Sequence, residues 1–558
     1  MKNTWNNSYS FRLISFAVTA LLIATSAFAQ DKTSEIDKIF SWVKPDTPGC
    51  AVAVSQQGKL IVNRAYGLAD LERNVPLTTE SLLDAGSIRK QFVAAAILIL
   101  AEEGKLSLAD DVRKYIPELH DFGHTITIDH LLTHTSGIRD WVPLLNWASG
   151  NPDAMSMILR QRTLNFVPGT EWSYSNSGYV LLPEIVTRVS GMKFSEFLHK
   201  RVLDPLGMKS SRYVDDPDVV IKNRALAYEP QRGGAWRADM RLGNERGGGG
   251  ALFTTASDLV LWNDALGSGR LGKFVTGKIQ EPATLSNGRK LSYARGLGFT
   301  TNYAGRLVLH SGGAAAYRSI AVRFVDQGIS VAVLCNAGEA SDNRDEFAGR
   351  IFDLFMADKG LHRPVPTPPP AGITGVDVTG RAGLFFNERT NEPLRLIANS
   401  GRLAIAGGGP LVTVAADRFR IARPTEMFMS GAEFELTFLS PDRFELTTKE
   451  GETTRYRRAR PYTPTDADLK SFAGRYESDE LRAVLQVTPG KGSLSARLNE
   501  SPTQVLELSP VDPDTFQRGM QTVRFRRDQA GKVIALDLIN PALRTIRFTR
   551  LSDGASRR

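Results

Sequence analysis

Ser87 and Lys90 place a hydroxyl nucleophile near an amine, at the start of a strongly apolar stretch. The stretch predicts a buried helix over residues 90–103. Because three residues make almost one helical turn, the Lys90 amine can reach back to the Ser87 hydroxyl. A serine is a poor nucleophile until a base removes its proton, and lysine is such a base only when burial or nearby positive charge lowers its pKa. On its own the spacing is more typical of a helix-capping serine beside a surface lysine.

Two later motifs supply companions of suitable chemistry. Tyr174 and Asn176 lie in a polar loop. A tyrosine oxygen can share a proton relay with a lysine, and an asparagine amide can hold a substrate carbonyl. His310, Gly312 and Gly313 end an apolar run that predicts a strand. Such an edge strand can bind an extended substrate through its backbone, and its glycines let an N–H group approach a reacting carbonyl oxygen.

In order and approximate spacing, these three motifs resemble those of the serine hydrolases related to class C β-lactamases and D,D-peptidases. Residues 48–54, 130–137 and 249–255 match further segments of that family, and the resemblance covers roughly residues 40–355. It implies an α+β fold of the β-lactamase/transpeptidase type, an α/β sandwich in which helices flank an antiparallel sheet.

The resemblance also implies a role for each motif. Ser87 would attack a carbonyl and form an acyl-enzyme, while Lys90 and Tyr174 would move its proton. The backbone N–H groups of Ser87 and Gly313 would form the oxyanion hole. The residues that the resemblance assigns to substrate binding and to the oxyanion hole are Asn176, His310, Gly312 and Gly313. No metal and no cofactor is expected at this site.

The third motif departs from the β-lactamase pattern. The β-lactamases of the family usually carry Lys-Thr-Gly, where this chain has His310-Ser311-Gly312. The histidine form is more typical of D-aminopeptidases, esterases and peptide hydrolases. We therefore expect an exported serine hydrolase that cleaves amide bonds of small peptides, as a D-aminopeptidase, D,D-peptidase or linear-peptide hydrolase does. The first alternative is a carboxylesterase or β-lactamase of the same family. The second is a penicillin- or peptide-binding sensor with little turnover.

Several elements must position these residues. The apolar pattern and its turn residues predict a hairpin whose turn contains Gln57 and Gly58. The continuous apolar run over residues 329–334 suits a central strand. Helices are expected over residues 180–189 and 350–357.

The length of 558 residues predicts about three to five domains. A proline-rich stretch over residues 363–370 favours extended backbone, and many short alternating runs follow it, which is typical of antiparallel barrels. The predicted division is a signal peptide (1–29), a hydrolase domain (30–360), a linker (361–374), two all-β barrel domains (375–462 and 463–552) and a tail (553–558).

The C-terminal region repeats weakly. Residues 382–385, 417–419 and 455–458 match residues 473–476, 514–516 and 547–550, at spacings of 91 to 97 residues. Two tandem barrels explain the match, and chance is the alternative. A hydrolase domain followed by two barrels resembles the D-aminopeptidases, in which a loop of the last barrel reaches the active site. Residues 490–492 or 518–520 are candidates for that loop.

The N-terminus predicts export. Lys2 and Arg12 are the only charged residues of the first 29, and the apolar run over residues 13–29 ends in Ala27-Phe28-Ala29, a small-x-small cleavage pattern. A signal peptide cleaved after Ala29 predicts a periplasmic or secreted protein. No later run has 18 consecutive apolar residues, so no membrane span is expected after cleavage.

The formal net charge of +9 raises the question of nucleic acid binding. Residues 361–558 hold 29 Lys and Arg against 23 Asp and Glu, and the densest cluster is Arg455, Arg457, Arg458 and Arg460. The cluster lies on short strand-like runs and no row of aromatic side chains accompanies it. We interpret it as the solvated face of a sheet, with a small peptide and not nucleic acid as the partner.

Three further features have alternative interpretations. His130 and His134 have the spacing of metal ligands but lack the glutamate of His-Glu-x-x-His, so a structural role is expected. The glycine run 247–250 is followed by no Lys-Ser/Thr and predicts a tight turn near the site. In the family sheet, the strands of Cys50 and Cys335 are antiparallel neighbours. A disulfide and two buried thiols both remain open, because export permits a disulfide whereas adjacent strands rarely have the required geometry.

Overall fold

The computed structural model describes residues 32–150, 152–216, 218–239, 249–364, 375–406, 410–421, 434–448, 451–498, 505–519, 521–540 and 543–552. Outside these residues lie the predicted signal peptide, residues 365–374 of the linker, the first half of the glycine run and Met520.

A six-stranded sheet forms the centre of the N-terminal part, with strand order β10-β11-β12-β13-β1-β2 and antiparallel pairing throughout. This confirms the expected α+β sandwich. The continuous apolar strand β13 is central, as predicted, because both of its edges are paired and both of its faces are covered. The strands are β1 (Cys50–Gln56), β2 (Lys59–Tyr66), β10 (Gly298–Asn302), β11 (Gly305–Ala314), β12 (Tyr317–Phe324) and β13 (Ile329–Cys335).

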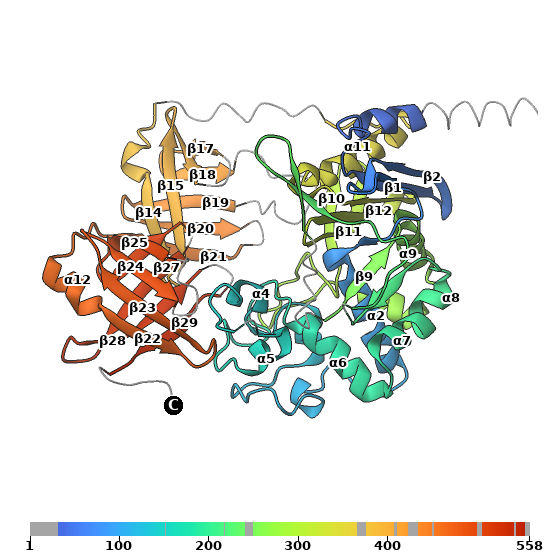
Figure 1. Cartoon of the computed structure of the whole chain (residues 1–558). Helices are drawn as coiled ribbons and strands as arrows, with labels where there is room; N and C mark the ends of the chain where they lie inside the picture. The colour runs from blue at the N-terminus through green and yellow to red at the C-terminus, as the bar shows by residue number, and fades with distance from the viewer. Residues whose placement is uncertain are drawn as a thin grey trace, which may run out of the picture.

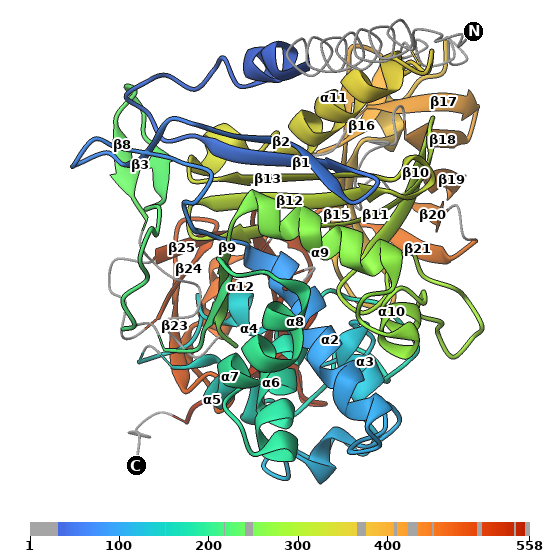
Figure 2. The same cartoon turned by 90° about the vertical axis from the view of Figure 1, so that its right-hand side faces the viewer.

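Helices cover both faces of this sheet (Figure 2). One face packs against α11 (Arg344–Ala357) and a helical segment over residues 32–39, and the other packs against α9 (Ala256–Ser268) with α2 (Arg89–Glu102) beyond it. Strand β1 alternates accordingly, with valines toward α11 and alanines toward α9. The small alanine side chains let α9 lie close to the sheet.

The remaining short elements connect and surround these layers. The other helices of the N-terminal part are α3 (Ile128–Leu132), α4 (Trp141–Leu144), α5 (Ala154–Leu159), α6 (Gly178–Ser190), α7 (Phe194–Leu198), α8 (Asp204–Leu206) and α10 (Lys273–Ile279). The short strands are β3 (Leu68–Asp70), β4 (Val75–Pro76), β5 (Leu83–Asp84), β6 (Arg212–Val214), β7 (Tyr228–Pro230), β8 (Trp236–Ala238) and β9 (Ala251–Thr254). In the part of the chain with described coordinates, no helix is both long and apolar enough to cross a membrane.

Most predicted elements of this part are present. The hairpin turns at Gln57 and Gly58, whose φ angles of 51° and 77° are those of a type I′ turn. The expected helix over residues 90–103 is α2, and that over residues 180–189 is α6. The helix expected from residue 350 begins earlier, at Arg344. Its first turn is charged and carries no apolar signal, but its acidic side chains suit the positive end of a helix.

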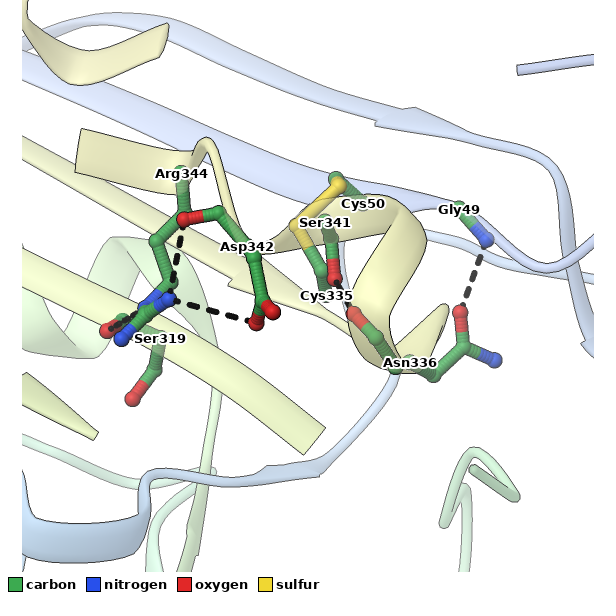
Figure 3. Close-up of a disulfide and its surroundings, with 9 residues drawn as sticks. Gly49, Cys50, Ser319, Cys335, Asn336, Ser341, Asp342 and Arg344 are labelled. Atoms are coloured by element: carbon green, nitrogen blue, oxygen red, sulfur yellow. Dashed lines mark hydrogen bonds and ion pairs between the residues drawn. A yellow bond between two sulfur atoms is a disulfide. The ribbon is translucent and has the colours of Figure 1, made fainter. Parts of the chain in front are cut away.

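Cys50 and Cys335 form a disulfide between β1 and β13, where they are register partners (Figure 3). Both side chains are fully buried. Next to the disulfide, Gly49 N–H donates to Asn336 Oδ1 over 2.8 Å. The open question about the two cysteines is therefore answered in favour of the bond.

Two eight-stranded antiparallel sheets follow, one above the other beside the N-terminal part (Figure 1). The first is nearly closed, since one isolated bridge, Ala404 to Pro410, joins its two ends, and the second is a closed barrel. The first barrel contains β14 (Gly383–Asn387), β15 (Pro393–Asn399), β16 (Arg402–Ile405), β17 (Leu411–Ala415), β18 (Arg418–Ile421), β19 (Phe434–Ser440), β20 (Arg443–Thr448) and β21 (Thr453–Arg458). The second contains β22 (Gly474–Ser478), β23 (Ala483–Pro489), β24 (Leu494–Leu498), β25 (Val505–Asp512), β26 (Thr515–Arg518), β27 (Gln521–Arg527), β28 (Val533–Ile539) and β29 (Ile546–Arg550).

The two all-β domains are thus confirmed as barrels, with one addition. A helix, α12 (Asp466–Phe472), precedes the second barrel. Thr465 and Asp468 form a capping box at its start. Seven residues are too few for a helical period to be visible among alternating runs, so this helix was not predicted. The predicted boundaries between linker, barrels and tail stay a proposal.

The sequence repeat corresponds to equivalent positions in the two barrels. An arginine of the last strand, Arg458 or Arg550, donates to the carbonyl of the alanine before the first strand, Ala382 or Ala473, over 2.8 and 2.5 Å. In the first barrel this guanidinium lies 4.7 Å from the centroid of the Phe385 ring. One turn is also shared, because Phe438 N–H and Phe525 N–H donate to Asp417 and Asp514 carbonyls respectively. These shared contacts support the interpretation of the match as two tandem barrels.

The arginine cluster of the first barrel is paired with carboxylates. Arg455 contacts Glu445 at 2.9 Å and Arg458 contacts Asp442 at 2.8 Å within that barrel. Arg457 and Arg460 instead contact Asp512 of the second barrel, at 3.0 and 3.5 Å. Asp512 is buried. The expectation of a solvated face is therefore wrong for Arg457, whereas the Arg460 side chain is largely exposed although it also contacts the second barrel.

Candidate active site

The nucleophile turn joins β5 to α2 through a single 3-10 turn, residues 86–88. Asp84 Oδ1 accepts a hydrogen bond from Gly86 N–H over 2.8 Å. Gly86 has a φ of 55°, and a Cβ atom there would lie 2.6 Å from the Gly313 nitrogen. Only glycine fits, because the turn rests directly on the end of β11. Ser87 follows, half-buried at the start of the helical segment.

A hydrogen-bonded chain leads from Ser87 into the protein. Lys90 Nζ lies 3.0 Å from Ser87 Oγ and donates to Asn176 Oδ1 over 2.8 Å. Asn176 Nδ2 donates in turn to Asp140 Oδ2 over 2.8 Å, which fixes the orientation of the amide. Asp140 also accepts from Val142 N–H as the cap of α4. Sequence reasoning missed Asp140, although it stands three residues after the matched segment 130–137.

Burial shifts the pKa values of the two groups beside Ser87, Lys90 and Tyr174, in opposite directions. Lys90 is 1 % exposed, and burial together with the positive charge of Arg89 holds its pKa well below the usual lysine range. The Tyr174 ring centroid lies 4.8 Å from Lys90 Nζ. Burial raises the pKa of Tyr174, and a hydrogen bond with the Ser87 side chain acts in the opposite direction. The lowered pKa of Lys90 favours its free-amine form and the raised pKa of Tyr174 favours its protonated phenol, a combination that suits proton transfer.

His310 is buried beside Lys90, and both ring nitrogens are engaged. Nδ1 lies 2.6 Å from the Ser311 carbonyl oxygen, and Nε2 lies 3.0 Å from the Tyr293 hydroxyl. Burial and the nearby Lys90 lower the pKa of His310 to about 4. The ring is therefore neutral at neutral pH, with Nδ1 as the donor to the carbonyl and Nε2 as the acceptor.

His134 completes this chain from the other side. Its Nδ1 accepts from Ser175 N–H over 3.2 Å, so its Nε2 carries the proton and lies 3.2 Å from the Tyr293 hydroxyl oxygen. Tyr293 then donates to His310. Burial holds the pKa of His134 well below its usual value. The expected structural role of His134 is therefore to link the Tyr174 loop to the third motif. Tyr293 carried no motif that could have singled it out.

The glycines of the third motif allow two backbones to meet. A Cβ atom at Gly312 would lie 2.1 Å from the Ala85 carbonyl oxygen, which accepts from Ser319 Oγ over 2.7 Å. Strand β10 pairs with β11 only as far as Leu309, so the edge beyond it has no strand partner among the described residues and faces the nucleophile turn. Gly313 is exposed there. This arrangement can present backbone N–H groups to a carbonyl beside Ser87.

The other residues singled out by sequence serve the surroundings. His130 Nδ1 accepts from Thr127 N–H over 3.2 Å in the cap of α3. Gly249 and Gly250 have φ angles of 82° and 79°, so the tight turn is confirmed for the described half of the run. Among the residues described, no group of three or more His, Cys, Asp and Glu side chains could hold a metal ion.

The two candidate barrel loops lie at opposite ends of the second barrel. The turns β22–β23 and β28–β29 contact the N-terminal part, through Leu481 and Thr545. Because the strands alternate in direction, the turn at residues 490–492 lies at the far end, away from this contact. The turn that contains Arg518 and Gly519 lies at the near end. Residues 518–520 therefore stay the candidate for a loop that reaches the site.

The α+β sandwich thus brings the half-buried Ser87 next to the buried Lys90, an arrangement that suits a serine-type hydrolase. The sequence profile of the Beta-lactamase family matches residues 30–353, more than half of the chain, and the chain belongs to this family.

Relatives and solved structures extend the similarity. The D-aminopeptidase of Brucella melitensis is 26% identical over 532 residues, which span 90% of this chain and 96% of that protein. The octameric penicillin-binding protein homologue from Pyrococcus abyssi superposes with a TM-score of 0.51 at 22% identity, over 78% of this chain and 100% of that one. The D-amino acid amidase from Ochrobactrum anthropi SV3, complexed with L-phenylalanine amide, has a TM-score of 0.50 at 22% identity, over 59% and 99%. The two solved structures share the fold.

Proposed function

We propose that the protein is an exported serine hydrolase that cleaves amide bonds of small peptides through an acyl-enzyme, in the manner of a D-aminopeptidase. The observation that carries the proposal is the chain from Ser87 through Lys90 and Asn176 to Asp140, with the lysine amine 3.0 Å from the nucleophile. The similarity to a D-aminopeptidase along 90% of the chain supports the choice of reaction.

In the proposed acylation, the free amine of Lys90 accepts the Ser87 proton while Oγ bonds to the substrate carbonyl carbon. The carbonyl oxygen becomes an oxyanion, held by the N–H groups of Ser87 and Gly313. When the tetrahedral intermediate collapses, the C–N bond breaks. The leaving amine takes the proton from the Lys90 ammonium group, by way of the Tyr174 hydroxyl.

Deacylation uses the same groups in reverse. A water molecule replaces the departed amine, gives a proton to Lys90 and bonds to the acyl carbon. The second tetrahedral intermediate breaks the bond to Ser87, whose oxygen recovers a proton from Lys90. The product acid leaves, and the free amine and serine hydroxyl are restored.

The neutral state of His310 favours a peptide over a β-lactam. A lysine at this position would offer a positive charge to a substrate carboxylate, whereas His310 is uncharged and both of its nitrogens are engaged. A substrate that needs no carboxylate contact here, such as a peptide that presents its amino end, suits such a site better.

Turnover of D-Ala-p-nitroanilide, L-Ala-p-nitroanilide, p-nitrophenyl acetate and nitrocefin tests this function. We expect cleavage of the D-alanyl anilide above the others, and none by Ser87→Ala. Cleavage of the ester alone would replace the proposal with an esterase, and preferred cleavage of nitrocefin would replace it with a β-lactamase. If no substrate turns over and a labelled penicillin binds, the protein is a sensor.

Export is part of the proposal and has its own test. The N-terminal pattern supports cleavage after Ala29. Fractionation of the native host followed by N-terminal sequencing should find the mature chain outside the cytoplasm, beginning at Gln30. A full-length chain in the cytoplasmic fraction would contradict export but would leave the proposed reaction unaffected.

A further inference from the structure

We propose that the two barrels hold the Tyr174–Asn176 loop in its working position through two ion-pair clamps. The first clamp is an ion pair to Arg139, next to Asp140. The second consists of ion pairs to Glu171, at the start of the loop. The inference rests on the proposed roles of Tyr174 and Asn176. It gives the barrels a positioning task that requires no barrel residue inside the active site.

The first clamp consists of Arg139 and Glu480. Arg139 is 1 % exposed, and its guanidinium forms an ion pair with Glu480 in the β22–β23 turn. The same guanidinium donates to the Thr545 carbonyl over 3.3 Å in the β28–β29 turn. Figure 1 shows α4, which begins two residues after Arg139, beside the second barrel. A buried arginine that loses its carboxylate must move toward another partner or toward water.

The backbone of Arg139 transmits its position to the active site. Its carbonyl oxygen accepts from Gln161 Nε2 over 2.9 Å and from Ser177 Oγ over 2.7 Å. Ser177 directly follows the loop. The next residue along the chain from Arg139 is Asp140, which holds the Asn176 amide. Arg139 therefore lies one residue from the end of the hydrogen-bonded chain that starts at Ser87.

The second clamp brings both barrels onto Glu171. Arg389 of the first barrel contacts its two carboxylate oxygens over 2.7 and 3.0 Å, and Arg544 of the second barrel contacts one of them over 2.8 Å. Arg544 also donates to the Asn165 carbonyl over 3.2 Å, and its guanidinium lies 5.2 Å from the centroid of the Phe166 ring. Two residues lie between Glu171 and Tyr174, so this contact fixes the entry of the loop.

The loop has no regular structure of its own to hold it in place. Residues 171–175 form no helix or strand. Two backbone N–H groups of the loop donate to one residue of the N-terminal part, from Ser173 to the His134 carbonyl and from Ser175 to His134 Nδ1. The clamps act on either side of these two hydrogen bonds. Displacing a positioned catalytic group by about 1 Å can cost on the order of 100-fold in rate.

The test compares clamp variants with a matched control in the full-length protein. Glu480→Gln breaks the first clamp, and Arg389→Met with Arg544→Met breaks the second. The control is Glu452→Gln, which breaks the 3.0 Å ion pair with Arg289 between the first barrel and the N-terminal part. That pair touches neither Arg139 nor Glu171. Rates of Ser87 labelling by a fluorophosphonate probe are measured with kcat and KM, at a temperature where circular dichroism finds every variant folded.

We expect each clamp variant to label about tenfold more slowly, with kcat reduced more than KM is raised, and the control to match the wild type. Amide hydrogen exchange read by mass spectrometry should rise in residues 139–145 and 171–177 in the clamp variants only. Wild-type labelling and exchange in both clamp variants would overturn the inference, and so would an equal change in the control.

Should Glu480→Gln fail to fold because Arg139 loses its partner, Arg389→Met alone still tests the second clamp, since the Arg389 side chain is largely exposed. The exchange measurement also separates the two proposals. Absence of Ser87 labelling in the wild type would contradict the proposed function, whereas the exchange pattern would still show whether the barrels hold the loop.

Discussion

At the proposed active site, the surroundings of the Lys90 amine favour its uncharged form. Lys90 is surrounded by protein and has Arg89 as its neighbour, and both effects disfavour the ammonium form. Arg89 is itself held, since its Nη1 donates to the Gly249 carbonyl over 2.9 Å. A positive charge is therefore fixed next to the proposed base, and together with burial it lowers the pKa of Lys90.

This predicts the pH dependence of the reaction. Lys90 acts as a base only when neutral, so kcat/KM should rise with pH through the lowered pKa of Lys90. Arg89→Gln removes the adjacent charge and should shift this acid limb to higher pH, while Arg89→Lys keeps the charge and should shift it less. The measurement is kcat/KM against pH for an uncharged substrate. An identical acid limb in Arg89→Gln and wild type would contradict the prediction.

Tyr293 offers a second prediction at this scale. Tyr293→Phe removes the hydroxyl between His134 and His310 and leaves His310 Nε2 without its donor. We expect a loss of stability of about 1–3 kcal/mol, the usual cost of an unsatisfied buried group, and a kcat reduced with little change in KM. Thermal unfolding and steady-state kinetics measure the two effects. Unchanged stability and unchanged kcat would show that the hydroxyl does not support the histidine.

At the scale of elements, the site forms where the turn before α2 meets the end of β11 with no side chains between the two backbones. The α2 turn approaches β11 at Gly86 and Gly312, where a Cβ atom would clash with backbone. Ser319 of β12 holds the same turn through the Ala85 carbonyl. These glycines thus set the distance between the proposed nucleophile and the proposed oxyanion donors.

Replacing one glycine should separate these elements. Gly312→Ala places a methyl group 2.1 Å from the Ala85 oxygen, and we expect a loss of activity of at least 100-fold because the turn must shift. Gly277→Ala is the matched control, since nothing lies within 4 Å of its Cβ position in α10. It should keep full activity and gain roughly 0.5–1 kcal/mol of stability. Wild-type activity in Gly312→Ala would show that the turn tolerates displacement.

The residues that sequence could assign are those joined by local geometry or strong pattern. Ser87 and Lys90 are three residues apart on one helix, and the apolar runs of α2 and β13 mark buried elements. Asp140 and Asn176 are 36 residues apart, and Tyr293 meets His134 across 159 residues. Such pairs arise only when the sheet and its helices assemble, so no spacing in the chain predicts them. The same holds for the clamps, whose partners lie in different domains.

At the scale of the whole molecule, the N-terminal part and the two barrels meet at the loop that carries Tyr174. A disulfide joins two neighbouring strands of the central sheet. The register places Cys50, Cys335, Arg318 and Gly313 in one row across β1, β13, β12 and β11. The disulfide therefore constrains the row of the sheet that ends at the proposed oxyanion glycine. Its two residues are separated by 285 positions.

Removal of the disulfide should lower stability with the chemistry intact. Cys50→Ala with Cys335→Ala should lose roughly 2–5 kcal/mol of unfolding free energy, while kcat at moderate temperature stays near that of the wild type. Denaturant unfolding of the hydrolase domain and kinetics measure this. Because both sulfurs are buried, a reducing agent should act on the native protein only slowly. Equal stability of the double variant and wild type would contradict a stabilising role.

The pairing of β1 with β13 also bears on how the chain reaches its destination. The first strand of the sheet cannot find one of its two neighbours until residues nearly 300 positions later have been made. A nascent chain that lacks this partner exposes an unpaired central strand and cannot complete its core. Late pairing would suit the proposed export of an unfolded chain, because the sheet cannot be completed until most of the chain has been made. The pairing of β1 with β13 and the disulfide would then both form after export, in an oxidising compartment.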